Sequence, residues 1–142
     1  MSEKPKTILL KGGFRLEEMP AAAAITPGML LAMDGDGKAA VHASAKGVAE
    51  RMFAFEDVLQ GKTIADAYST DNPVQCGIVN PGAEVYAWVK GGETVLVGGL
   101  LEADGAGRFQ AVTNGVPLAV ALEAFDGGDS AGDHTRIKVR VL

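Results

Sequence analysis

Two stretches of this chain, 70 residues apart, are near copies of each other. Residues 28–38 read GMLLAMDGDGK and residues 98–108 read GGLLEADGAGR, with six of eleven positions identical. Asp-Gly between apolar runs is typical of a β-hairpin, because glycine adopts the positive φ that its tight turn requires. We therefore predict that residues 28–56 and 98–126 form equivalent three-stranded units, with the matched pairs Leu30 and Leu100, Leu31 and Leu101, and Phe55 and Phe125.

Other short segments also have the pattern of strands. Residues 14–19 and 137–141 alternate apolar and polar side chains, as strands with one covered face do. Residues 74–79 and 84–89 flank the turn sequence Asn80-Pro-Gly, which predicts a central hairpin. In a chain of 142 residues these elements predict one all-β domain of about eight to ten short strands.

A short helix is expected within residues 56–68. Thr63 and Asp66 have the spacing of a helix N-cap followed three residues later by an acid. The prediction is thus an all-β fold with at most one or two short helices.

Two aromatic side chains lie on the second strand of the predicted central hairpin. Tyr86 and Trp88 share one face of the segment 84–89, and three small apolar residues share the other. Either the aromatic face is covered by a loop or another subunit, or the aromatic residues form the core and the small residues face outward. The sequence leaves both alternatives open.

Charge is distributed unevenly along the chain. The formal net charge is −5, but residues 1–15 contain four cations and one acid and so carry +3, which leaves −8 for the rest. An acidic body argues against a nucleic-acid partner, because neutralisation of phosphates supplies much of that affinity. The basic N-terminal segment is either a contact for an acidic protein surface or a solvated tail with incidental lysines.

No catalytic or metal-binding pattern is recognisable. Gly61-Lys-Thr63 lacks the earlier glycine of a phosphate-binding loop, since Glu56 stands there. The turn at 34–37 is followed by Lys38, where a calcium loop requires an oxygen ligand. We therefore predict a protein that is not an enzyme and that uses no metal and no cofactor.

The single cysteine and the lack of long apolar runs indicate a reducing compartment and no membrane partner. Cys76 cannot form an intramolecular disulfide, and we predict a buried, unreactive thiol. No apolar run approaches the roughly 20 residues that cross a bilayer.

Six segments carry an order of turns and short strands that covers nearly the whole chain. They are residues 15–30 (RLEEMPAAAAITPGML), 50–68 (ERMFAFEDVLQGKTIADAY), 81–88 (PGAEVYAW), 98–107 (GGLLEADGAG), 120–125 (VALEAF) and 137–141 (IKVRV). Together they resemble the head decoration, or capsid cement, proteins of tailed bacteriophages. The loop at 126–133 is not explained by this resemblance.

The resemblance implies a small β-barrel or β-tulip-like domain without enzymatic activity. It would comprise an extended N-terminal arm, residues 1–13, and a decoration domain, residues 14–142. Such a protein, made in the cytoplasm of the host bacterium, binds the major capsid protein on the outer surface of the virion as a homotrimer and stabilises the lattice.

Candidate contact residues follow from charge and size. The basic residues near the N-terminus, Lys4, Lys6, Lys11 and Arg15, are the candidates for capsid contact. Ala21 and Ala22 permit close approach, and Tyr86 and Trp88 supply apolar area, so these four are the candidates for the trimer interface. The alternative function is a small-ligand or carbohydrate-binding β-domain displayed on the virion, for which Tyr86 and Trp88 would be the anchors.

Overall fold

The fold is all-β, as the sequence predicts. The computed structural model describes residues 4–127 and 134–142, so most of the loop predicted at 126–133 lies outside the described residues. The described strands are β1 (Leu9–Lys11), β2 (Phe14–Pro20), β3 (Leu31–Met33), β4 (Ala39–Val41), β5 (Met52–Ala54), β6 (Pro73–Val79), β7 (Glu84–Val89), β8 (Thr94–Val95), β9 (Leu100–Ala103), β10 (Phe109–Ala111), β11 (Ala119–Ala121), β12 (Phe125–Asp126) and β13 (Thr135–Val141). One 3₁₀ helix, η1 (Val58–Gln60), accompanies them.

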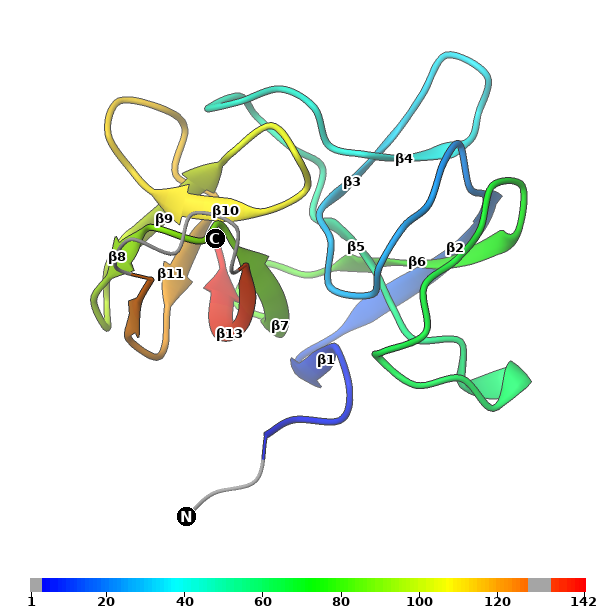
Figure 1. Ribbon diagram of the computed structural model, residues 1–142, viewed down its shortest axis with the longest axis horizontal. Coiled ribbons are helices and arrows are strands. Elements are labelled where there is room, and N and C mark those ends of the chain that lie inside the picture. The colour runs from blue at the N-terminus through cyan, green and yellow to red at the C-terminus, as the bar shows by residue number, and fades with distance from the viewer. Residues whose placement is uncertain (1–3, 128–133) are drawn as a thin grey trace.

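Five strands close into a barrel in the half of the molecule that holds the C-terminus (Figure 1). Around the barrel the order is β7, β10, β9, β11, β13 and back to β7. The closing contact pairs β13 with β7 over six residues, from Thr135–Val89 to Arg140–Glu84. Closure pairs strand edges that an open sheet would leave exposed.

The interior of the barrel is filled by alternate residues of its longest strands. Tyr86 and Trp88 therefore lie on the outer face of β7, which decides between the two orientations that the sequence left open. The prediction of an apolar inner face for residues 137–141 is confirmed. The buried residues on the inner faces of β7 and β13 are Val85, Ala87, Val89, Ile137, Val139 and Val141, and Tyr86 is buried on the outer face of β7.

The other half of the molecule contains a three-stranded sheet and a hairpin. In the sheet, β6 lies between β2 and β5, and the hairpin pairs β3 with β4. A separate buried cluster that includes Ile25, Leu31 and Met52 fills this half. Leu30 and Phe53 belong instead to the cluster of the barrel, so they join the two halves.

The predicted central hairpin is wrong. β6 and β7 form at the expected places, but they do not pair with each other. The turn between them does form, with Ala83 N donating to Asn80 O at 3.0 Å. Both edges of β6 are already occupied by β2 and β5, while β7 pairs with β1, β10 and β13. The turn thus carries the chain from the sheet into the barrel.

The repeated hairpins have the same register at an offset of 70 residues. Leu31 pairs with Val41 in the first hairpin, and Leu101 pairs with Ala111 in the second. The turns match in detail, because Asp34 Oδ1 accepts from the N–H of residues 36 and 38, and Asp104 Oδ1 from those of residues 106 and 108.

The equivalence ends after the hairpin. Leu30 bridges to Phe53, whereas Leu100 pairs with Val120, which is three residues earlier in the second copy. Phe55 and Phe125 therefore occupy different positions: Phe55 is buried, while Phe125 is half-buried and pairs with Val95.

The helix expected within residues 56–68 is reduced to the single turn of η1. Gly61, with φ of 70°, ends it in the left-handed conformation. Asp66 Oδ2 accepts hydrogen bonds from Thr63 N at 2.7 Å and from Thr63 Oγ1 at 3.2 Å, so the capping contact forms. No helix follows it, because the next residues turn toward Ile25, which bridges to Tyr68.

The N-terminal arm predicted at residues 1–13 is partly built into the barrel. Ile8 is fully buried, and its carbonyl accepts a hydrogen bond from Tyr86 N at 2.7 Å. β1 then pairs with β7. Of the described residues in this segment, those before Ile8 precede the first strand (Figure 1), and Lys4 and Pro5 line a cavity on the barrel together with Tyr86 and Trp88.

Candidate functional site

Four large apolar side chains are exposed around strand β2 and helix η1. Phe14 and Leu16 are 46% and 49% exposed, and Val58 and Leu59 are 65% and 90% exposed. We call these four residues the β2–η1 patch. They border a groove of about 240 Å³ that Phe55 also lines. Exposed apolar side chains gathered around a hollow are typical of surfaces that contact another molecule.

Phe55 fixes the floor of this groove. Its ring lies against the backbone of β6 at Gly77, and its centroid is 5.5 Å from that of Phe14. Its carbonyl accepts a hydrogen bond from Tyr68 Oη at 2.6 Å. Burial raises the pKa of Tyr68 to about 12, so the hydroxyl keeps its proton and remains a donor near neutral pH.

The outer edge of β2 pairs with no other described strand. Within the described part of the chain β2 pairs only with β6, and Asn80 N donates to Gly13 O at 3.0 Å on that side. Backbone groups alternate in an antiparallel ladder, so Phe14, Leu16 and Glu18 direct their N–H and C=O groups away from β6. The β2–η1 patch therefore lies beside a row of free backbone donors and acceptors.

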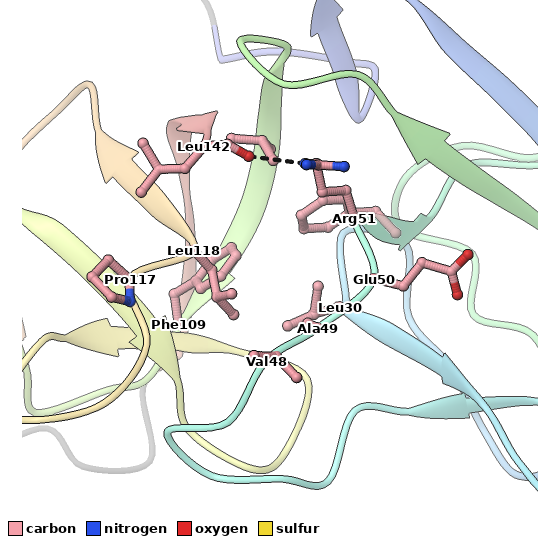
Figure 2. Close-up of a pocket in the computed structure, with 11 residues that line it drawn as sticks. Leu30, Val48, Ala49, Glu50, Arg51, Phe109, Pro117, Leu118 and Leu142 are labelled. Carbon is pink, nitrogen blue, oxygen red and sulfur yellow. Dashed lines mark hydrogen bonds between the residues drawn. The ribbon is translucent and has the colours of Figure 1, made fainter.

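A second cavity, of about 200 Å³, lies where the barrel meets the other half (Figure 2). Phe109 and Leu118 form one wall, and Leu30 lies opposite them. At its mouth, Arg51 Nε donates a hydrogen bond to Leu142 O at 2.9 Å. The cavity thus combines apolar walls with a cation that is already bonded within the chain.

Two of the predicted trimer-interface residues are buried within the chain. Ala21 is fully buried and forms a bridge with Ala39, and Tyr86 is 7% exposed. The small side chain of Ala21 permits close packing inside the molecule, and this corrects the assignment of Ala21 to the trimer interface. Ala22 is half-buried, and its N–H donates to Ala39 O at 2.8 Å.

Trp88 is half-buried against the same chain. Its indole Nε1 donates to Pro27 O at 2.9 Å, and the guanidinium of Arg136 lies over its ring at 4.4 Å. Trp88 is therefore a contact between the barrel and the loop at Pro27, and it presents less free apolar area than the sequence suggested.

The structure places the predicted capsid-contact residues on two strands and on the segment that precedes them. Lys4, Lys6, Lys11 and Arg15 are all exposed. Lys4 and Lys6 precede the barrel, whereas Lys11 ends β1 and Arg15 lies in β2. Arg15 also forms an exposed ion pair with Glu17 at 3.1 Å.

Sequence reasoning missed the buried carboxylate of Glu102. It accepts hydrogen bonds from Gln110 Nε2 at 2.7 Å, Gly115 N at 2.9 Å and Thr113 N at 3.2 Å. Burial alone would raise the pKa of Glu102, but these hydrogen bonds and the charge of Lys46 lower it below its usual value. The position of Glu102 between the apolar residues Leu101 and Ala103 was its only signal in the sequence.

Cys76 is fully buried in the sheet, as predicted. Burial raises the pKa of its thiol to about 11, which keeps the sulfur protonated near neutral pH.

The described residues contain no cluster of three or more His, Cys, Asp or Glu side chains that could hold a metal ion. Within the same part of the chain, no helix has the length and apolar character needed to cross a bilayer. Comparison of the sequence with protein-family models and with curated proteins gives no match.

Proposed function

We propose that this protein is a structural virion protein that binds the outer surface of a tailed-bacteriophage capsid as a homotrimer and stabilises the lattice. The observation that carries the proposal is the β2–η1 patch beside the free edge of β2. Removing apolar surface from water contributes roughly 25 cal/mol per Å², which the entropy cost of association offsets in part. The choice of a capsid as the partner and of a trimer as the oligomer rests on the resemblance of the order of turns and strands to capsid cement proteins.

A second apolar surface supports a cyclic arrangement of copies. Leu96 and Val97, in the loop after β8, are 71% and 67% exposed, and Leu100 in β9 is 45% exposed. This loop and η1 lie at opposite ends of the long axis (Figure 1). Two different patches on one protomer can join head to tail, and such contacts form a closed ring when the rotation permits. In the proposed trimer, each β2–η1 patch covers the β8–β9 loop of the next copy.

The exposed lysines at the N-terminus supply the proposed contact with the major capsid protein. Lys4 and Lys6 are exposed and precede β1, and the rest of the chain is acidic. A trimer presents three such segments at once, which raises the effective concentration of the second and third contacts. The protein would be made in the host cytoplasm and would reside on the capsid exterior.

The decisive experiment combines light scattering with co-sedimentation on undecorated capsids. We expect a trimer in solution and saturable binding to particles. The double variant Leu16→Ser/Leu59→Ser should be monomeric and bind weakly, because it removes apolar area from the β2–η1 patch. Val48→Ser is the matched control, since Val48 is 74% exposed but lies outside both patches.

A monomeric wild-type protein that also fails to sediment with capsids would contradict the proposal. Capsid binding by a monomer would retain the decoration role and refute the head-to-tail trimer.

A further inference from the structure

A half-buried guanidinium on the outer face of the barrel has no acidic partner. Arg136 Nε donates to Pro27 O at 3.2 Å, and Nη2 donates to Ile64 O at 2.5 Å. Among the described residues Arg136 makes no ion pair, whereas Arg108 and Arg140 pair with Asp104 and Glu84. Burial lowers the pKa of Arg136, because the cation loses hydration that two carbonyl oxygens replace only in part.

The nearest acidic side chains are used elsewhere. Against the effect of burial, the negative charge of Glu56 raises the pKa of Arg136 slightly. The Oε1 atom of Glu56 instead accepts a hydrogen bond from Ile8 N at 3.1 Å. Burial and the negative charge of Glu123 both raise the pKa of Tyr86, and the Oε1 atom of Glu123 accepts a hydrogen bond from Lys138 N at 3.2 Å. Neither carboxylate hydrogen-bonds to the guanidinium.

Arg136 lines a cavity of about 240 Å³ whose described lining contains no Asp or Glu. Lys4 supplies a second cation, and Tyr86 and Thr135 supply hydroxyl groups. Ile64 and Trp88 supply apolar surface. This arrangement of donors is unexpected in a chain whose net charge is −5.

We propose that this cavity binds a small ligand through an oxyanion, a carboxylate or a phosphate, held by Arg136 and Lys4. A guanidinium has five N–H donors in a planar fork that matches such groups, and Arg136 uses two of them within the chain. The hydroxyls of Tyr86 and Thr135 can donate to the same anion. Trp88 and Ile64 contact the carbon skeleton of the ligand. The site is separate from the β2–η1 patch, so the inference goes beyond capsid decoration.

Gly28 leaves room for the loop whose Pro27 O holds the guanidinium before any ligand arrives. A Cβ at this residue would lie 2.9 Å from Tyr86 O and 3.2 Å from Arg136 Nε. Only glycine allows the loop after Pro27 to pack this closely, and it also has a φ of +95°. Because Pro27 O and Ile64 O already hold the guanidinium, its contact with a ligand costs little additional side-chain entropy.

The test is titration of the full-length protein with sodium phosphate and, separately, with sodium acetate, at constant ionic strength set with sodium chloride. Binding is followed by NMR shifts of the Trp88 indole and the backbone amides of β13. We expect saturable shifts at these positions with at least one of the two anions, and none with chloride. The stronger anion identifies the ligand as a phosphate or a carboxylate.

Variants assign the donors. Arg136→Lys keeps the positive charge but removes the planar set of N–H donors of the guanidinium. It should weaken anion binding by about tenfold or more. Lys4→Gln should weaken it by a smaller factor while leaving the packing of Trp88 intact. Arg140→Gln is the matched control, because Arg140 lies on the same strand and is exposed, and it should bind as wild type.

Shifts no larger than those with chloride for both anions would overturn the inference. The inference would also be overturned if Lys4→Gln and Arg136→Lys both bound the anion with the affinity of the wild type. If Arg136→Lys does not fold, Lys4→Gln and Tyr86→Phe decide the question, since an anion held by these donors must bind both variants more weakly. None of these measurements involves capsids, so their outcome is independent of the proposed decoration role.

Discussion

The ring of Phe55 takes the place of a side chain at Gly77. A Cβ built at Gly77 would lie 2.1 Å from Phe55 Cζ, so only glycine leaves room for the ring on β6. This contact sets the position of Phe14, whose ring packs on Phe55 from β2. One missing side chain thereby determines the shape of the groove beside the β2–η1 patch.

Gly77→Ala should therefore destabilise the protein by about 1–3 kcal/mol, the range for overpacking in a well-packed site. Chemical denaturation measures the change in the free energy of unfolding. Gly35→Ala is the control, since a Cβ there meets nothing within 4 Å, and it should change stability by less than about 0.5 kcal/mol. Equal stability of the two variants would show that Phe55 moves without cost.

Glu102→Gln should lower the free energy of unfolding by about 1–3 kcal/mol. The amide has one acceptor oxygen in place of two, so at least one of the N–H donors from Thr113, Gly115 or Gln110 loses its partner. Glu50→Gln, at an exposed position, is the control and should have little effect. Denaturation at neutral pH checks both variants.

The effect of Glu102 should depend on pH in a defined direction. Its pKa in the folded protein lies below the ordinary value of 4.5, so the carboxylate adds stability at pH values above 4.5. That contribution is lost as the pH falls through the pKa of the folded state. The stability gap between wild type and Glu102→Gln should therefore shrink under acid conditions, and a gap that stays constant down to complete acid unfolding would contradict this role.

Cys76 should resist thiol reagents in the folded protein. Full burial and a thiol pKa raised to about 11 leave almost no accessible thiolate at neutral pH. Labelling with a chromogenic disulfide should be slow in buffer and complete in denaturant. Rapid labelling under native conditions would show that the β2–β6–β5 sheet opens readily.

Truncation should separate the N-terminal lysines from the fold. Deletion of residues 1–6 removes Lys4 and Lys6 but keeps Ile8 and β1, so the thermal midpoint should change little. Deletion of residues 1–11 also removes the fully buried Ile8 and the pairing with β7. It should lower the free energy of unfolding by about 2–5 kcal/mol. Similar midpoints for both truncations would mean that β1 adds nothing to the barrel.

The elements that the sequence predicted best are those determined by local chemistry. Asp-Gly turns specify their own hydrogen bonds, so both hairpins and their common register could be predicted from residues 28–38 and 98–108. Alternation along 137–141 likewise identified the inner face of β13.

The errors arose where pairing depends on distant residues. Nothing near Asn80 indicates that β6 pairs with β2 and β5 while β7 joins the barrel. The three-residue shift in the partner of the second hairpin has the same origin. Leu30 bridges to Phe53 and Leu100 pairs with Val120, and these two partners belong to different sheets. The β2–η1 patch was missed for this reason too: exposure of Phe14 and Leu59 depends on which surfaces the rest of the chain covers.

The order of strands around the barrel has a consequence for synthesis of the chain. β7 ends at Val89, and the strand that closes the barrel against it begins only at Thr135. On the ribosome, β7 emerges well before its main partner, and non-local pairing of this kind is slow to form. The nascent protein therefore carries an open strand edge until translation reaches β13, and a chain that stalls before that point is a candidate for aggregation or for removal by proteases.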